Sequence, residues 1–443
     1  MFWIWMCLTA VRAQSVVDSL ALVDLFNATN GAQWTQSWNL QEPVANWYGV
    51  EIENGRVAGL VLSQNGLEGA IPASIAAMDA LRALDLSYNQ LSEIEALPPN
   101  LYYLDLSHNA FQGPIPAVSS ELWYLNLSHN AFAGPIPELS AGTIVEIDLS
   151  HNNLSGELPA EIGTWTELVY LDFSHNNLSG TIPASYADIP ILTTMNLSHN
   201  QLSGALPQTF ELSTFLETLR LENNLLEGLP TLASPPLSGA FTVQNNRLDF
   251  GDLEPNYAKF ANAAEYGYAP QDSVGTAQEI TAWEGQTITL SAATPGANNL
   301  YRWYFNGAPL SDEPGSSPVF ETTATQSGTF DCEISNPLFP ELTLHRRPVR
   351  LSVVPGQYPG DANRDRICDT GDVFAIAAAY GVSGPARTQP GVLWQAYVPA
   401  PDWHQTYVWR GNALNVKYCD ADGDGTVTLF DLAVAIANRG LSY

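Results

Sequence analysis

The segment LVYLDFSHNNL, residues 168–178, is one of seven that share the frame L-x-x-L-x-L-x-x-N-x-L, with Ile, Phe or Met replacing some leucines. The other six begin at positions 81, 101, 122, 144, 192 and 216, so each step is 20 to 24 residues. Repetition at such a period indicates a solenoid, whose units bury their apolar faces against one another. A first unit begins near Val57 and a degenerate last one runs to Leu248.

The alternation inside the frame predicts a short strand. Apolar residues at frame positions 4 and 6 point to one side and enter a common core, whereas positions 3, 5 and 7 point to the opposite side. The Asn at position 9 marks a turn, where its amide can satisfy backbone groups of adjacent coils. The L-S-G-x-[IL]-P stretch that follows, as in Gly180 to Pro183, ends each extended run.

Together these features resemble plant-type leucine-rich repeats, found in receptor ectodomains and in bacterial surface proteins. The resemblance implies an α/β solenoid with its C-terminal cap over residues 56–270, and an N-terminal cap over residues 14–55. In the N-terminal cap we expect an amphipathic helix around Leu20 to Phe26. Trp34, Trp38 and Trp47 follow it and can plug the first coil. For function, the resemblance implies recognition of a ligand, usually on the concave face of the solenoid.

Large rings and acidic or amide side chains gather at the positions that face the concave side. Because several exposed rings in one place are disfavoured without a partner, we predict a binding site for a protein or carbohydrate ligand. The alternative is a solvated strand face with aromatic residues that favour β-structure. The predicted ligand-binding residues are Tyr102, Tyr103, Asp105, Trp123, Tyr124, Asn126, Asp148, Tyr170 and Asp172.

Five histidines occupy frame position 8, which invites a metal-binding or a pH-switch hypothesis. In stacked coils we expect them about 5 Å apart, which is the spacing of strands in a sheet. Position 8 is also a surface position, and duplication copies whatever residue it holds, so we do not assign a metal to them. These residues are His108, His129, His151, His175 and His199.

The composition excludes some classes of partner. The chain has 16 Lys and Arg against 46 Asp and Glu, which gives a formal net charge of −30. Such a charge repels nucleic acid and attracts cations, so we expect no nucleic-acid partner.

Residues 1–13 are predicted to form a signal peptide, because a short apolar run ends in a small-residue site at Ala13. No later apolar stretch of about 20 residues predicts membrane insertion. We therefore expect the protein to be secreted or extracellular, with association to the cell surface as an alternative. The sequence leaves the oligomeric state open.

From Gln271 the pattern changes to strands of 5–8 residues separated by turns. The segments resemble strands B, C, F and G of an all-β immunoglobulin-like sandwich, which we place over residues 271–355. Trp303 takes the place of the core tryptophan of strand C, and Cys332 that of the strand F cysteine. The partner cysteine is missing, and Ala292 is the nearest match. The resemblance implies a spacer or an accessory adhesion domain.

Two twelve-residue segments near the C-terminus, 361–372 and 420–431, repeat one pattern of oxygen-bearing side chains. Oxygen ligands fall at loop positions 1, 3, 5, 9 and 12, and position 7 offers its carbonyl, which suits the six to eight hard ligands of Ca²⁺. The pattern therefore predicts two calcium ions. The first set is Asp361, Asn363, Asp365, Ile367, Asp369 and Asp372, and the second is Asp420, Asp422, Asp424, Thr426, Thr428 and Asp431.

Aspartate at position 12 and a single following helix resemble dockerin type I repeats, so we predict a small α dockerin-like domain over residues 356–443. Loop one has Arg366 where Gly usually provides a positive φ, which makes it the weaker site. The long insert 382–418 sets the segment apart from a typical dockerin and makes docking to a cohesin-like protein less secure than calcium binding. Cys368 and Cys419 flank the loops, and we hypothesise a disulfide between them.

The sequence offers no motif of catalysis: it lacks G-x-S-x-G, H-E-x-x-H and the P-loop. We therefore expect a multi-domain, non-enzymatic binding protein. The alternative is a dockerin-bearing component of a polysaccharide-degrading or adhesion assembly.

Overall fold

The computed structural model describes residues 16–139, 143–311 and 313–354. Beyond them it describes the backbone of four short strands, β28 (Ile367–Cys368), β29 (Thr406–Trp409), β30 (Asn412–Asn415) and β31 (Leu441–Ser442). The chain divides into two compact units. Unit 1 is Met1–Ser273 with Thr294–Asn299 and Ser335–Leu344, and unit 2 is Val274–Ala293, Leu300–Ile334 and His345–Tyr443. Within the described ranges, no helix has the length and apolar character needed to cross a membrane.

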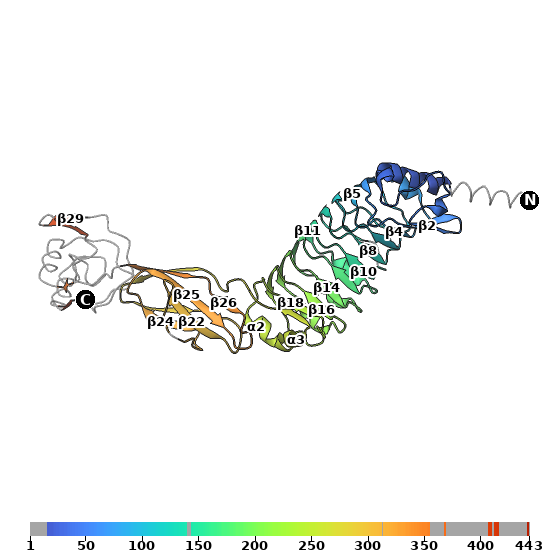
Figure 1. Ribbon diagram of the computed structural model, residues 1–443. Coiled ribbons are helices and arrows are strands. Elements are labelled where there is room, and N and C mark those ends of the chain that lie inside the picture. Colours follow the sequence, from blue (N-terminus) through green and yellow to red (C-terminus); the bar gives the residue numbers. More distant parts are fainter. Residues whose placement is uncertain are drawn as a thin grey trace, which may run out of the picture. The chain divides into compact units, whose positions relative to one another are not determined.

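Unit 1 is built on an eleven-stranded sheet in the order β1-β2-β4-β6-β8-β10-β12-β14-β16-β18-β19. The strands from β2 onward are parallel and in register, and only β1 pairs antiparallel with β2. Figure 1 shows them following one another along the solenoid. Their bounds are β1 Val50–Glu53, β2 Arg56–Val61, β4 Ala83–Asp85, β6 Tyr103–Asp105, β8 Tyr124–Asn126, β10 Glu146–Asp148, β12 Tyr170–Asp172, β14 Thr194–Asn196, β16 Thr218–Arg220, β18 Ala240–Thr242 and β19 Glu265–Gly267.

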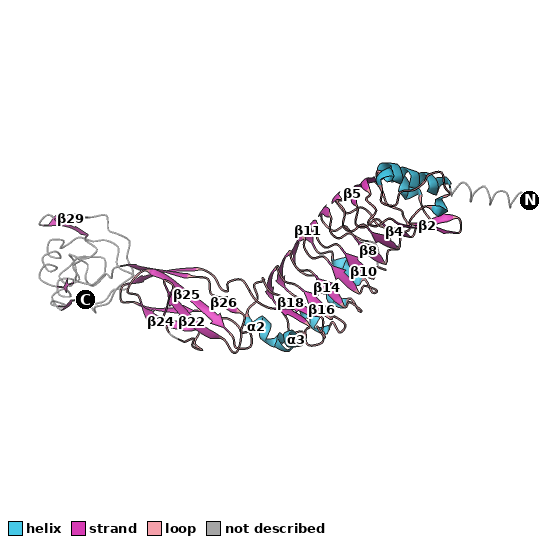
Figure 2. Ribbon diagram, viewed as in Figure 1, coloured by secondary structure: helices cyan, strands magenta, loops and turns pink. Residues whose placement is uncertain are grey.

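A second parallel sheet runs along another side of the coils in the order β17-β15-β13-β11-β9-β7, and β3 pairs with β5 in a separate ribbon. Short 3₁₀ helices follow the prolines of several repeats (Figure 2). The strands are β3 Glu68–Ile71, β5 Gln90–Ile94, β7 Gln112–Gly113, β9 Ala131–Gly134, β11 Asn153–Glu157, β13 Asn177–Gly180, β15 Gln201–Ala205 and β17 Leu225–Gly228. The 3₁₀ helices are η3 Ala73–Ala77, η4 Ala160–Thr164, η5 Ala184–Asp188 and η6 Gln208–Leu212.

The core of unit 1 consists of the apolar frame positions. Leu84, Leu104 and Leu171 at position 4 are fully buried, as are Leu86 and Phe173 at position 6. Each coil alone could not bury these side chains, so the free energy of burial is gained only when coils stack.

The position 9 asparagines form the ladder that the sequence predicts. Asn176 donates from Nδ2 to the carbonyls of Leu149, Phe173 and Ser174 at 3.0 to 3.2 Å, and its Oδ1 accepts the Leu154 N–H at 2.9 Å. The same pattern recurs in the neighbouring coils, so each amide ties two coils together. The prediction that these amides satisfy buried backbone groups is confirmed.

The N-terminal cap contains a helix over residues 16–28, followed by η1 (Gly31–Gln33) and η2 (Val44–Asn46). Trp34, Trp38 and Trp47 are 4 to 6% exposed, with successive ring centroids 4.9 and 4.7 Å apart, so they form one buried cluster. Their role as a plug of the first coil stays a prediction. Leu22 and Leu25 of this helix are fully buried, whereas Leu20, which we expected on the apolar face of the helix, is 60% exposed.

Three short helices cover the last coil of the solenoid, at the β18 end of the eleven-stranded sheet. They are α2 (Phe250–Leu253), η7 (Glu254–Asn256) and α3 (Tyr257–Asn262). Asp249 caps α2 by accepting from the Gly251 and Asp252 N–H groups, and Phe260 of α3 stacks on Phe241 of the sheet at 4.3 Å. The chain then adds β19 as the last strand of the sheet. These elements protect the final coil from solvent, as a terminal cap must.

The described part of unit 2 is mainly β-structure. One sheet has the order β20-β27-β25-β22-β23 with β26 beside β25, and β21 pairs with β24. Trp303, Cys332 and Ala292 are all buried, at 5, 1 and 4% exposure. The immunoglobulin-like assignment stays a prediction, as do the predicted domain boundaries. The strands are β20 Gln278–Trp283, β21 Thr287–Ser291, β22 Leu300–Phe305, β23 Ala308–Pro309, β24 Val319–Thr323, β25 Gly328–Ser335, β26 Thr343–His345 and β27 Val349–Val354.

Candidate functional site

Nine predicted ligand-binding residues lie on or beside strands β6 to β12, and we refer to them together as the aromatic–carboxylate face. Frame positions 3 and 5 of each strand flank a buried position 4, so they lie on the side of the sheet away from the core. Frame position 2 directly precedes each strand. Before β6 and β8 it holds Tyr102 and Trp123, whose side chains are each 40% exposed. The nine are Tyr102, Tyr103, Asp105, Trp123, Tyr124, Asn126, Asp148, Tyr170 and Asp172.

Four of the rings form one cluster. The parallel register places Tyr103 opposite Tyr124, and their rings stack at 4.4 Å with planes 5° apart. Tyr102 stacks on Trp123 at 6.2 Å, and Trp123 also meets Tyr103 and Tyr124 at 6.1 and 6.0 Å. The cluster therefore presents two exposed rings above two half-buried tyrosines.

Tyr170 does not join this cluster. Glu146 of β10 lies between Tyr124 and Tyr170 in the column of position 3 residues. Tyr170 instead donates from its hydroxyl to Asp172 Oδ2 at 3.2 Å. The sequence prediction grouped Tyr170 with the other rings because it considered each frame by itself; ordering the frames would have exposed the intervening Glu146.

The acidic and amide side chains form the adjacent column at position 5. Asp105 and Asp148 each accept an N–H from the serine two residues later, at 2.9 Å, through Oδ1. Asp172 accepts in the same way from Ser174, and its Oδ2 also accepts from Asn196 Nδ2 at 2.8 Å. The site prediction omitted Asn196, which the structure joins to the face through this bond.

Burial shifts the pKa values of aspartates and tyrosines on the aromatic–carboxylate face. It raises the pKa of Asp105 and of Asp148, while hydrogen bonds from Ser107 and Ser150 oppose the rise. Burial also raises the pKa of Tyr103 and of Tyr170, and nearby carboxylates add to the rise. The phenols therefore stay protonated at neutral pH and offer O–H donors beside carboxylate acceptors.

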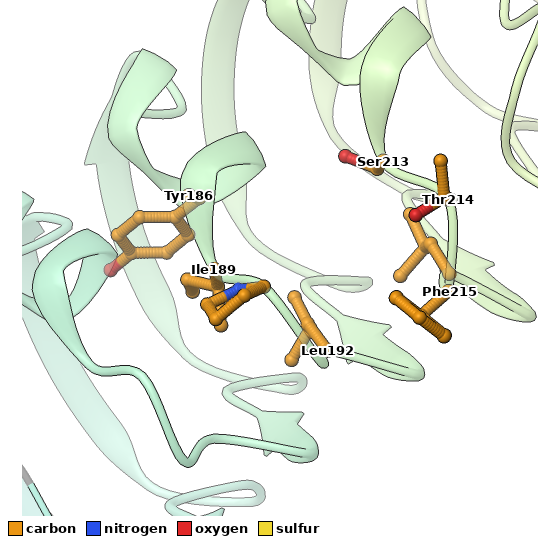
Figure 3. Close-up of a pocket in the computed structure, with 8 residues that line it drawn as sticks. Tyr186, Ile189, Leu192, Ser213, Thr214 and Phe215 are labelled. Atoms are coloured by element: carbon orange, nitrogen blue, oxygen red, sulfur yellow. The ribbon is translucent and has the colours of Figure 1, made fainter.

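The coil turns form a small crevice. It has a volume of about 10 Å³ and is lined by Tyr186, Ile189, Leu192 and Phe215, among others (Figure 3). This is about the space of a single water molecule, so the crevice does not hold a ligand of any size.

The predicted calcium ligands lie outside the described residues, except that the backbone of Ile367 is described in β28. Of the predicted disulfide, the backbone of Cys368 lies in the same strand and Cys419 lies outside the described residues. Within the ranges that the structure describes, no group of three or more His, Cys, Asp or Glu could hold a metal ion.

Comparison with known proteins shows that the chain carries leucine-rich repeats. Leucine-rich-repeat family models match residues 143–202 and residues 100–120. Over 107 residues the chain is 36% identical to Receptor-like protein 7 of Arabidopsis thaliana, an alignment that covers 23% of this chain and 11% of that protein.

Two solved structures are also similar to this chain. The crystal structure of PEPR1-AtPEP1 is 25% identical with a TM-score of 0.50, covering 59% of this chain and 42% of that one. The Arabidopsis receptor kinase HAESA ectodomain, solved with a peptide hormone ligand, is 27% identical with a TM-score of 0.44, covering 53% and 46%. The chain thus spans about a tenth of the curated relative and less than half of each solved chain.

Proposed function

We propose that this chain is an exported, non-catalytic binding protein whose leucine-rich-repeat unit captures a peptide on the aromatic–carboxylate face. The observation that carries the proposal is the cluster of Tyr102, Tyr103, Trp123 and Tyr124, two of whose rings are 40% exposed. An exposed ring cluster of this kind is a feature of interaction sites.

The neighbouring column favours a peptide with basic side chains over a neutral sugar. The second oxygen of Asp172 already accepts from Tyr170 and Asn196. Asp105 and Asp148 each spend one oxygen on a serine N–H, which leaves the second oxygen to other partners. A Lys or Arg side chain can pair with these oxygens and place its aliphatic part or its charge against a ring. Similarity to a receptor-like protein and to PEPR1-AtPEP1 supports recognition by this unit. If the ligand is a carbohydrate and not a peptide, the test below would reveal it.

The test is selection from a random peptide library on the immobilised full chain at neutral pH. We expect enriched peptides that carry Lys or Arg together with apolar residues. The double variant Tyr102→Ser/Trp123→Ser should lose at least about tenfold in affinity, which corresponds to two truncated anchors. The matched control is Phe215→Ser, another exposed ring of unit 1 that is not part of the aromatic–carboxylate face, which should lose less than about twofold. Equal binding by all three proteins, or enrichment only on a glycan array, would refute the proposal.

A second function concerns residues 356–443, for which the duplicated twelve-residue spacing is the supporting observation. We propose that this segment is a dockerin-like domain that binds two calcium ions, with Cys368 and Cys419 bridged, and that it docks a cohesin-like partner. Residues 271–355 would then form an immunoglobulin-like spacer.

Calorimetric titration of Ca²⁺ into the full chain tests the calcium part. Two sites are expected, with Asp420→Ala removing the tighter and Asp361→Ala the weaker one. Absence of heat at millimolar Ca²⁺ would eliminate the calcium sites.

A further inference from the structure

Six rings form a continuous ladder along one edge of the eleven-stranded sheet, in addition to the aromatic–carboxylate face. Tyr88 stacks on His108 at 4.1 Å between ring centroids, and four further histidine steps follow at 3.9 to 4.1 Å. The ladder consists of Tyr88, His108, His129, His151, His175 and His199. The expected spacing of about 5 Å is too long, and the planes of successive rings are inclined to each other by 11 to 13°.

The backbone holds every rung in the same conformation. All six residues have φ between 53 and 55°, the left-handed region that most residues avoid. In the next two coils the equivalent positions are Asn223 and Asn245, with φ of 57 and 55°. Asparagine is among the residues best suited to this region, so it offers a conservative replacement for any rung.

The last histidine of the ladder contacts the asparagine at the equivalent position of the next coil. Asn223 Oδ1 accepts from Asn245 Nδ2 at 2.7 Å, which turns Asn223 Nδ2 toward His199 Nε2 at 3.0 Å.

Charged groups face the ladder from the adjacent column. Asp105 and Asp148 act on His108, and Asp148 and Asp172 act on His129, in each case favouring the charged ring. Burial has the largest effect, and together with the neighbouring histidines it lowers the pKa of His108, His129 and His175. His108, His129 and His175 thus titrate under the influence of neighbouring histidines and of the carboxylates beside them.

The stacking argues against a shared metal ion. The lone pairs of imidazole nitrogens lie in the ring planes. In nearly parallel rings they do not converge, whereas a metal ion needs two nitrogens about 2.0 to 2.1 Å from one point. Proton binding requires no such convergence.

We propose that this ladder is a proton-sensing edge of the aromatic–carboxylate face, which becomes positively charged on acidification and then releases a cationic ligand. Imidazolium groups beside the Asp column would satisfy the carboxylates that a basic peptide would otherwise occupy. The release of a ligand rests on the proposed function, whereas the coupled titration of the rings does not.

The first arm of the experiment is an NMR pH titration of the full chain with isotope-labelled histidine. The ladder histidines should titrate in broadened, interdependent steps. Substituting the central rung by His151→Asn should raise the midpoints of His129 and His175, because each loses a charged neighbour. The exposed His345 of unit 2 serves as the internal control, with no change between the two proteins. Independent titration of all ladder rings, unmoved by His151→Asn, would overturn the proposal.

The second arm measures binding of fluorescein-labelled hexalysine at pH 7.5 and at pH 5.5. The native chain should lose roughly five- to tenfold more affinity on acidification than a variant in which all five ladder histidines are Asn. Equal losses in both proteins would overturn the release step. Coupled titration without hexalysine binding at pH 7.5 would confirm the proton-sensing ladder and refute the cationic-ligand function together with the release.

Discussion

Removing two adjacent members of the asparagine ladder should destabilise unit 1 by more than the sum of the single changes. In Asn176→Ala the three carbonyls that the amide served each keep another donor: Leu149 O keeps Asn152, Phe173 O keeps Asn200, and Ser174 O keeps the His151 N–H. Only the Leu154 N–H loses its partner. One buried unsatisfied donor costs about 1–3 kcal/mol, and we expect a loss of that size.

Asn152→Ala follows the same logic and leaves the Phe132 N–H without its acceptor. The two variants share one group, the Leu149 carbonyl, which both amides contact. In the double variant this carbonyl loses both donors. The coupling energy should therefore be about 1 kcal/mol or more, the cost of one further unsatisfied buried acceptor.

The matched control is Asn152→Ala with Asn200→Ala. These two asparagines serve no common carbonyl, so their effects should add to within about 0.5 kcal/mol. The free energies come from urea unfolding of the full chain, with hydrogen exchange assigning the transition to unit 1. Coupling of the same size in both pairs would refute the shared-carbonyl account.

Three further predictions concern other parts of the described structure. Arg56→Met should cost about 3–5 kcal/mol of unfolding free energy, because Asp18 is 1% exposed and loses its bidentate partner; adding Asp18→Asn should recover part of the loss. Burial raises the pKa of the Cys332 thiol to about 12. A thiol reagent should therefore detect equal numbers of thiols in the native chain and in Cys332→Ala while both are folded, and one fewer in the variant after unfolding. Burial, and then the nearby Asp252, raises the pKa of Asp249 to about 6, above its unfolded value. The folded state consequently binds the proton more tightly, and this contribution to stability is lost as the pH rises through 6. Asp249→Asn keeps the helix cap and should be more stable than the native chain above pH 6 but not below about pH 4, as thermal unfolding at both pH values would reveal.

The repeat frame contains enough information to predict the solenoid and its asparagine ladder. Each frame repeats the buried leucines at positions 4 and 6 and the hydrogen-bonding Asn at position 9. Each coil therefore repeats the same local structure. The exposure of Leu20 could not be predicted from the sequence. Helical periodicity defines the apolar face of a helix but not which part of that face the first coil covers. Glu146 is seen to interrupt the column only when successive frames are aligned. The ring spacing depends on how the coils pack, which a frame considered alone does not contain.

The same in-register stacking limits which residues can repeat. Identical leucines or asparagines at one frame position gain contacts from one coil to the next, but identical carboxylates about 5 Å apart repel. The position 5 column reads Asp85, Asp105, Asn126, Asp148, Asp172, Asn196 and Arg220, so each pair of acids is followed by an amide. Asn196 donates to Asp172, and Arg220 is engaged by Glu265 rather than by the column. The amides thus limit each run of adjacent carboxylates to two without neutralising them. This remaining charge is the physical reason to expect a cationic ligand.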